Sequence, residues 1–328
     1  MIGQISNLIN VTLGYSSTLL LGSTGEIITE KSGNLNLGTP GIMCIGGVSG
    51  VVGAYFYTGA SQTINPILAV IITFLAAIVG SLLTTLIYSF LTITLKANQN
   101  VTGLALTTFG IGLSNFIGGI INSKAEGNSG VSAFPEISTI YQTKLPFADK
   151  LGFIGDSFLS SGFMTYLAIV IAFIVAYIIN STRVGLNLRA VGENPATADA
   201  AGINVDRYKY FATCIGGIIS GLGGLHFVMQ YASGGWNKDS IGQLGWLSVA
   251  LVIFAVWRPR LGIVGSIIFG ALYALSICLP EIAPRTQQIL SALPYVVTIV
   301  VLAFSSMRNK KENQPPASLG LPYFREDR

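Results

Sequence analysis

A bundle of membrane-spanning helices is the fold class that this 328-residue sequence predicts. Apolar residues make up 51% and charged residues only 10%, whereas a soluble domain carries about 25% charged residues. The mean hydropathy is +0.65, and apolar runs long enough to cross the hydrocarbon layer recur along the chain. Because lipid accepts such a surface and water does not, we expect an all-α polytopic protein.

The pattern of apolar runs predicts about nine spans, within a range of eight to ten. They are placed at residues 8–28, 41–58, 66–92, 101–121, 158–180, 208–230, 242–257, 261–279 and 288–306. The second and the seventh are short and partly polar, so we expect them to be broken or re-entrant. The third apolar run continues to Leu95, which predicts a helix that is tilted or that protrudes from the membrane.

Small residues recur four positions apart inside several predicted spans. Examples are Gly46 with Gly50, Gly217 with Gly221, and the series Gly262, Ser266 and Gly270. Small residues on one face let two helix backbones approach closely. The spacing therefore predicts tight packing between helices of the bundle.

The positions of Lys and Arg predict that the N-terminus is outside and the C-terminus inside. In this orientation 13 of the 18 basic residues lie in inner segments and five in outer ones. We expect a transmembrane domain at residues 1–307, with an external loop near 122–156 and a cytoplasmic loop near 181–207, followed by a cytoplasmic tail at 308–328 that is extended on the surface.

The cytoplasmic loop contains a strong local helix signal. Asn194 is a good N-cap, Pro195 suits the first helical position, and residues 196–201 include four alanines. Gly202 can adopt the left-handed conformation that ends a helix. The result is a predicted helix of about two turns, which is marginal alone and must pack against something. It could dock into a soluble partner, or it could be an ordinary connecting loop that is helical.

The run at residues 185–205, GLNLRAVGENPATADAAGINV, resembles the coupling loop of ABC importer permeases in the branched-chain amino acid and ribose permease superfamily. EKSGNLNLG at 30–38, and GWLSVALVIF at 245–254 with WRP at 257–259, resemble other motifs of that group. ASLGLPYFREDR at 317–328 resembles the tail of one branch, the nucleoside permeases that work with basic-membrane-lipoprotein-type binding proteins.

This resemblance implies an ABC importer permease fold in the bacterial plasma (inner) membrane. It implies three kinds of partner: ABC ATP-binding subunits docked on the cytoplasmic loops, a second and different permease subunit, and an external substrate-binding lipoprotein. The residues that match the coupling segment are Glu193, Asn194, Pro195, Asp199, Ala201 and Gly202. We expect Glu193 and Asp199 to set the charge contacts of the docking helix.

No catalytic site, cofactor or metal is expected in this chain. It lacks the G-x-x-x-x-G-K-[ST] motif that holds ATP phosphates, so ATP hydrolysis would fall to the partner subunits. The three cysteines lie in apolar runs and read as buried hydrophobes. His226 is the only histidine and is expected to pack or hydrogen-bond rather than to act as a ligand. The basic tail is read as a topology signal and not as a nucleic-acid site.

Uncharged polar residues are the candidates for a solute path. The six chosen are Asn34, Asn36, Thr39, Asn115, Gln230 and Trp246. Amide and aromatic groups suit a nucleoside, whose base can stack and hydrogen-bond. Such residues also serve as headgroup anchors or as bonds between neighbouring helices, and that alternative stays open.

No predicted span carries a charge near its middle, and Glu26, which comes nearest, is expected close to the inner boundary. This pattern argues against a secondary transporter driven by protons or ions, which needs titratable groups at mid-membrane. The favoured hypothesis is import of a small neutral polar solute, a nucleoside above others. A sugar or vitamin permease of the same superfamily is the first alternative, and a secondary transporter is the second.

Overall fold

The computed structural model describes residues 2–61, 63–124, 134–144, 146, 148, 152–278, 284–307 and 314–324, and within them it contains helices and no strand. The elements are α1 Ile2–Lys31, α2 Thr39–Ala60, α3 Pro66–Ser89 continued by the π-helix η1 Phe90–Thr94, α4 Gln99–Lys124, α5 Pro135–Tyr141, α6 Gly152–Ile154, the π-helix η3 Gly155–Leu159, α7 Phe163–Ser181, α8 Arg183–Glu193, α9 Pro195–Ala200, α10 Val205–Gln230, α11 Ser240–Phe254, α12 Pro259–Cys278 and α13 Pro284–Met307.

The predicted all-α fold is confirmed, and each predicted span falls on a helix. Five helices are long and apolar enough to cross a membrane, namely α2, α3 with η1, α4, α7 and α10. The apolar parts of α11, α12 and α13 are shorter, so nine crossings stay a prediction. The break expected in the second or seventh span is absent, because α2 and α11 are continuous helices, and the re-entrant course offered as the alternative stays a prediction.

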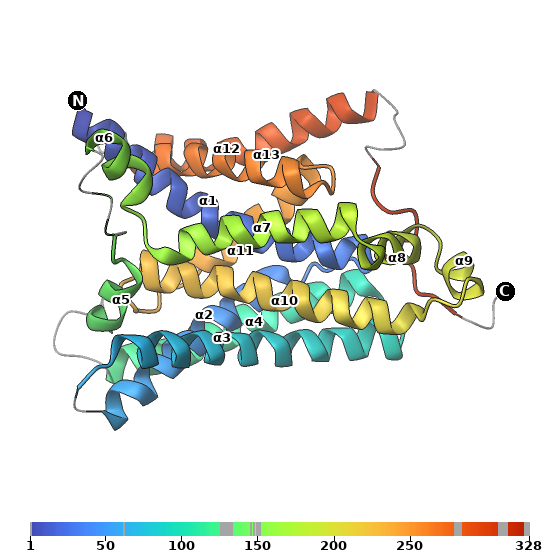
Figure 1. Ribbon diagram of the computed structural model, residues 1–328, viewed down its shortest axis with the longest axis horizontal. Helices are drawn as coiled ribbons and strands as arrows, with labels where there is room; N and C mark the ends of the chain where they lie inside the picture. Colours follow the sequence, from blue (N-terminus) through green and yellow to red (C-terminus); the bar gives the residue numbers. More distant parts are fainter. Residues whose placement is uncertain are drawn as a thin grey trace.

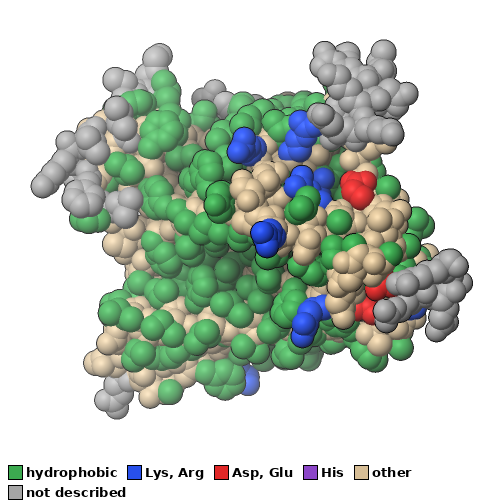
Figure 2. Space-filling model, turned by 45° about the vertical axis from the view of Figure 1, so that its right-hand side comes forward, with side chains coloured by type: hydrophobic (Ala, Val, Ile, Leu, Met, Phe, Trp, Pro, Cys, Tyr) green, Lys and Arg blue, Asp and Glu red, His purple; other side chains and the backbone are tan. Residues whose placement is uncertain are grey.

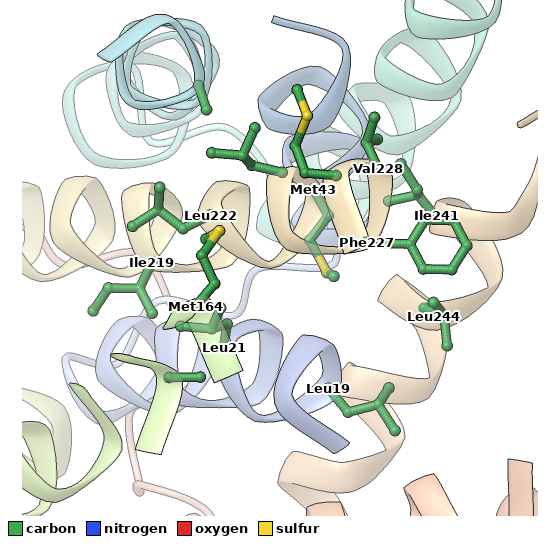
Figure 3. Packing of buried hydrophobic residues seen from close by; sticks show 14 of the residues in the cluster. Leu19, Leu21, Met43, Met164, Ile219, Leu222, Phe227, Val228, Ile241 and Leu244 are labelled. Atoms are coloured by element: carbon green, nitrogen blue, oxygen red, sulfur yellow. The ribbon is translucent and has the colours of Figure 1, made fainter. Parts of the chain in front are cut away.

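α1 and α10 form the centre of the bundle (Figure 1). They pack along each other, α1 also contacts α7, α11 and α12, and α10 also contacts α2 and α3. Figure 3 shows Leu21 of α1 and Met43 of α2 among Leu222 and Phe227 of α10. In the most apolar stretch, 78% of the residues of α10 are buried but only 28% of those of α3. The outer helices thus present an apolar surface suited to lipid.

The close approach of α2 to α10 depends on glycine. A methyl group added at Gly46 would lie 2.5 Å from the Cα atom of Gly221, which is closer than two non-bonded carbon atoms can come. Gly217 faces the Thr85 side chain of α3, and Gly270 of α12 faces Ser16 of α1, at similarly short range. The tight packing that the small-residue spacing predicts is therefore confirmed at these positions.

The two ends of the bundle carry different segments. α5 and α6 lie at one end beside the start of α1, whereas α8, α9 and the C-terminal segment (residues 314–324) lie at the other (Figure 1). Figure 2 shows one face of the molecule, on which Lys, Arg, Asp and Glu side chains gather toward that second end and apolar side chains cover much of the rest. The predicted external and cytoplasmic loops thus belong to opposite ends. Residues 125–133 and 149–151 of the former and 308–313 and 325–328 of the tail lie outside the described residues.

The packing at Gly46 predicts a position-specific effect within one helix. We expect Gly46→Ala to destabilise the protein by about 1–3 kcal/mol, because neither backbone can yield without disturbing α2 and α10. The measurement is the thermal unfolding midpoint of the purified protein in detergent. Gly59→Ala is the matched control, since an added methyl group there has no neighbour within 4 Å. Equal midpoints for the two variants would contradict the packing argument.

Candidate functional site

The start of α9 is built as its sequence predicts. The side-chain oxygen of Asn194 accepts a hydrogen bond from the Thr197 backbone N–H at 3.0 Å, and Pro195 occupies the first turn. The capping oxygen satisfies one of the backbone donors that every helix leaves free at its start. α9 therefore begins at a fixed point of the chain.

The end of α9 is equally well defined. Gly202 has φ +84°, a left-handed conformation that other residues adopt at a cost. The N–H of Ile203 bonds the carbonyl of Ala198 at 3.0 Å, and the N–H of Gly202 bonds that of Asp199 at 2.9 Å. This pair of bonds is the Schellman arrangement, in which a glycine past the helix end closes the last turn. The predicted stop at Gly202 is confirmed.

Packing holds this short helix in place. Ala198 is 3% exposed and lies in a small apolar cluster with Val191 of α8 and Val205 of α10. A helix of six residues would not persist in water on its own propensity. The opposite face, made of Ala196, Thr197, Ala200 and Ala201, is exposed. α9 is thus a rigid projection whose outer face carries only small side chains.

Sequence reasoning did not predict α8, the helix that connects α9 to the bundle. Thr182 caps it by accepting from the Gly185 N–H at 3.2 Å, and its buried residues, including Leu188 and Val191, recur at helical spacing. That cap and that spacing are the signal that could have revealed it. α8 contacts α9 on one side and α7 and α1 on the other.

The last turn of α8 lies directly on the last turn of α1. A methyl group added at Gly192 would be 2.2 Å from the backbone oxygen of Lys31 and 3.3 Å from the nitrogen of Gly33. Two backbones in contact leave no flexible side chain between them that could absorb a displacement. The end of α8 is therefore in rigid contact with the end of α1 and with the turn that follows it.

Of the six residues that match the coupling segment, Glu193, Asn194, Ala201 and Gly202 are exposed, whereas Pro195 and Asp199 are half-buried. Both acidic residues contact this chain's own C-terminal segment. An oxygen of Glu193 accepts from the Ala317 N–H at 3.4 Å, and Asp199 accepts from the Tyr323 hydroxyl at 2.9 Å. The tail, expected to be extended on the surface, packs against α8 and α9.

Three of the predicted path residues meet in the turn between α1 and α2. Asn34, Asn36 and Thr39 are all fully buried. The Nδ2 atom of Asn36 lies 3.4 Å from Oγ1 of Thr39, and the Nδ2 atom of Asn34 lies 3.4 Å from Oγ1 of Thr213 in α10. The Oδ1 atom of Asn34 has no partner among the described residues. A polar cluster thus lies beneath the contact between α8 and α1.

Two carboxyl groups of α1, neither of them among the predicted site residues, complete this cluster. Glu26 is 1% and Glu30 is 3% exposed, and the Thr39 hydroxyl donates to Glu26. The indole N–H of Trp257 donates to Glu30. Buried carboxyl groups require hydrogen-bond partners, which here come from α2 and from the turn between α11 and α12. Glu26 lies toward the end of α1 that faces α8 and α9, and the sequence predicted it close to the inner boundary of the first span.

The other three path candidates lie apart from this cluster. Asn115 of α4 accepts from the Trp236 indole N–H at 2.9 Å and donates to Asp239 at 3.2 Å. The backbone oxygen of Gln230, at the end of α10, accepts from Gln142 beside α5. Trp246 is half-buried in α11. The structure therefore brings Asn34, Asn36 and Thr39 together and does not unite all six candidates in one site.

His226 fills the bonding role that the sequence predicted for it. It is fully buried in α10, with Nδ1 at 2.8 Å from the Thr18 hydroxyl and Nε2 at 3.3 Å from that of Thr165. Both ring nitrogens thus join α10 to α1 and α7. Among the described residues there is no group of three His, Cys, Asp or Glu side chains that could hold a metal ion.

Residues 8–302 match the family described as the permease component of the branched-chain amino acid transport system. A guanosine ABC transporter permease of Bacillus subtilis is 31% identical over 99% of this chain and 98% of its own. A nucleoside ABC transporter permease of Lactococcus lactis is 31% identical over 88% and 89%. A Haloferax volcanii ABC transporter permease, provisionally named for glucose, is 32% identical over 98% of both chains.

One solved structure is also similar to this chain. It is an ABC transporter in an inward-facing conformation, provisionally described as of the metal-chelate type. The likeness covers 90% of this chain and 84% of that one, with 14% sequence identity and a TM-score of 0.49. A likeness at this level carries no conclusion.

The hydrogen bond between Trp257 and Glu30 predicts a stability effect. Trp257→Phe removes the donor and leaves a buried carboxyl oxygen without its partner, which costs about 1–3 kcal/mol. We expect a lower thermal unfolding midpoint than for Trp246→Phe, which removes an indole that makes no hydrogen bond within the described residues. A midpoint as high as that of the control would show that the bond does not hold α1 to this turn.

Proposed function

The chain belongs to the permease-component family of the branched-chain amino acid transport system, and from this we infer that it is the membrane permease subunit of an ATP-driven importer for a nucleoside. Family membership supports the transport role, and the relatives named for guanosine and for nucleosides support the solute. ATP hydrolysis belongs to separate subunits, so this chain works as a moving path and not as an enzyme.

The observation that carries this function is the direct backbone contact between α8 and the end of α1. An ATP-binding subunit docks on the exposed small-residue face of α9 and displaces it when ATP binds or is hydrolysed. α8 follows α9, because Val191 and Ala198 share one buried cluster. The contact of Gly192 with Lys31 passes the displacement to the turn that holds Asn34, Asn36 and Thr39. The docking site and the path are thereby linked by rigid, packed backbone.

The polar cluster in that turn is the part of the path that the solute meets on the α9 side. The unpartnered Asn34 Oδ1 atom offers a hydrogen bond to an uncharged solute, and the Asn36 amide, bonded to Gly38 and Thr39, fixes the turn beside it. Glu30 is bonded to Trp257 and positions the turn, whereas Glu26 is bonded to Thr39 through one oxygen only and its Oε1 atom has no partner among the described residues. Asn115, Gln230 and Trp246 belong to the opposite part of the same path.

Three partners complete the transporter in this proposal. They are the ATP-binding subunits at α9, a second and different permease subunit in the membrane, and an external lipoprotein that delivers the solute at the end that carries α5 and α6. The protein is a multi-pass component of the bacterial plasma membrane, with residues 1–307 as its transmembrane domain and 308–328 as its cytoplasmic tail.

Uptake by a strain that lacks the gene tests the solute. We expect loss of uptake of radiolabelled guanosine or another nucleoside, restored by the gene on a plasmid. Labelled glucose is the necessary comparison, because one relative is provisionally named for glucose. Loss of glucose uptake with normal nucleoside uptake would replace the nucleoside by a sugar and leave the permease role standing. Uptake that continues without an ATP-binding subunit would refute the permease role.

The glycine stop of α9 predicts how coupling can be weakened. Gly202→Val imposes a left-handed backbone on a β-branched residue, which costs about 1–2 kcal/mol and loosens the helix end. We expect solute-stimulated ATP hydrolysis in reconstituted vesicles to fall several-fold. Asparagine tolerates this conformation, so Gly202→Asn should retain most of the stimulation.

Ala201→Val is the control for added bulk, because Ala201 is equally exposed but has φ −81°. If Gly202→Val and Ala201→Val behaved alike, the effect would come from side-chain volume at the docking face and not from the helix stop.

A further inference from the structure

The C-terminal segment (residues 314–324) is bonded to the coupling region along its inner side. The Ser318 N–H donates to the carbonyl of Gly192 at 3.0 Å, and its hydroxyl donates to the same oxygen at 2.5 Å. The Gly320 N–H donates to the carbonyl of Gly33 at 3.2 Å. Ser318 is 7% exposed. The segment therefore lies across the junction of α8 with the turn after α1.

The same segment continues to α9 and to the end of η1. The Tyr323 hydroxyl donates to the Asp199 carboxylate at 2.9 Å, and the Tyr323 ring packs against the cluster of Ala198, Val191 and Val205. The Nζ atom of Lys96 lies 4.3 Å from the centre of the Phe324 ring, a cation–π contact. Three parts of the chain that are distant in sequence, namely the turn after α1, Lys96 and the consecutive helices α8 and α9, thus meet on these eleven residues.

The outer side of the segment exposes large apolar side chains. Leu321 is 58% and Phe324 is 41% exposed. They flank Tyr323 in the chain, which bonds Asp199 of α9, and the exposed face of α9 carries only small side chains. Large exposed apolar side chains give a partner protein contact area, and the small side chains of α9 allow its backbone to approach closely.

Lipid is a poor occupant for this surface. A hollow of about 240 Å³ beside it is lined by Lys96, Asp199, Asp206 and Tyr323, together with the backbone turn after α9. Charged groups of both signs at this place require water or a polar partner. The surface also lies at the end of the bundle where charged side chains gather (Figure 2). A soluble protein fits these properties.

We propose that the C-terminal segment and α9 form one composite docking surface for the ATP-hydrolysing subunit. The segment braces α9 through Ser318 and Tyr323 and adds Leu321 and Phe324 to the contact area. This inference rests on the proposed function, which supplies the partner, and it extends the docking surface beyond the cytoplasmic loop to the end of the chain.

Photo-crosslinking in the assembled transporter tests the contact. p-Benzoylphenylalanine is placed at position 324, and in separate samples at 200 on α9 and at 153. Phe153 is the matched control, because it is also a phenylalanine, is 44% exposed and lies at the opposite end of the bundle. We expect crosslinks to the ATP-binding subunit from positions 324 and 200 and none from 153.

Each other outcome decides a specific question. Crosslinks from position 200 without any from 324 would overturn the composite surface and leave the proposed function standing. Crosslinks from neither position would contradict both. Crosslinks from 324 alone would support the C-terminal segment as a docking element and contradict α9 as the coupling helix.

Removal of one hydroxyl group tests whether the C-terminal segment braces α9. Tyr323→Phe removes the bond to Asp199 and keeps the ring, and we expect the backbone amides of residues 198–203 to exchange hydrogen roughly three- to tenfold faster in the assembled transporter. Tyr166→Phe is the matched control, because Tyr166 is also half-buried and donates one bond at 2.9 Å, to the carbonyl of Phe158. Unchanged exchange at 198–203 would show that the segment does not brace α9.

Discussion

The contact between the last turn of α8 and the last turn of α1 is the constraint on which the proposed mechanism depends. It exists because Gly192 has no side chain, so the backbone of α8 touches that of Lys31 and Gly33. A displacement of a helix outside the membrane can reach a helix inside it only through a rigid contact. Packed backbone meets this requirement better than long, mobile side chains do. In the proposed mechanism, the solute path and the docking surface therefore move together.

α1 collects the polar groups that this unit needs. Glu26 and Glu30 receive hydrogen bonds from α2 and from the turn after α11, so two elements converge on the end of α1. That turn holds Val256 and Trp257 at φ 52° and 54°, a conformation that costs about 1–3 kcal/mol per residue and must be offset by surrounding contacts. A strained turn tied to a buried carboxyl group is suited to a part that changes position during transport.

The resemblance of residues 185–205 to the permease superfamily is confirmed by the family match, which covers residues 8–302. Local signals along the chain were equally readable. The cap at Asn194, the proline after it and the stop at Gly202 depend on a few neighbouring residues, and the structure has each of them. The sequence did not reveal that α2 and α11 are continuous. Polar residues in a short span can indicate a broken helix, but they can equally lie in a continuous helix and contact its neighbours.

Hydropathy, spacing and helix-end residues by themselves determined the fold class, the positions of the long apolar helices, the faces of small residues and the short helix at 195–200, since all these follow from residues within a few turns of the chain. Only the tertiary structure decided that Glu30 meets Trp257, that Asn34, Asn36 and Thr39 lie apart from Asn115, and that the C-terminal segment holds α9. The residues in each of these cases are distant in sequence. Whether they lie together or apart depends on how the helices pack and not on any local preference.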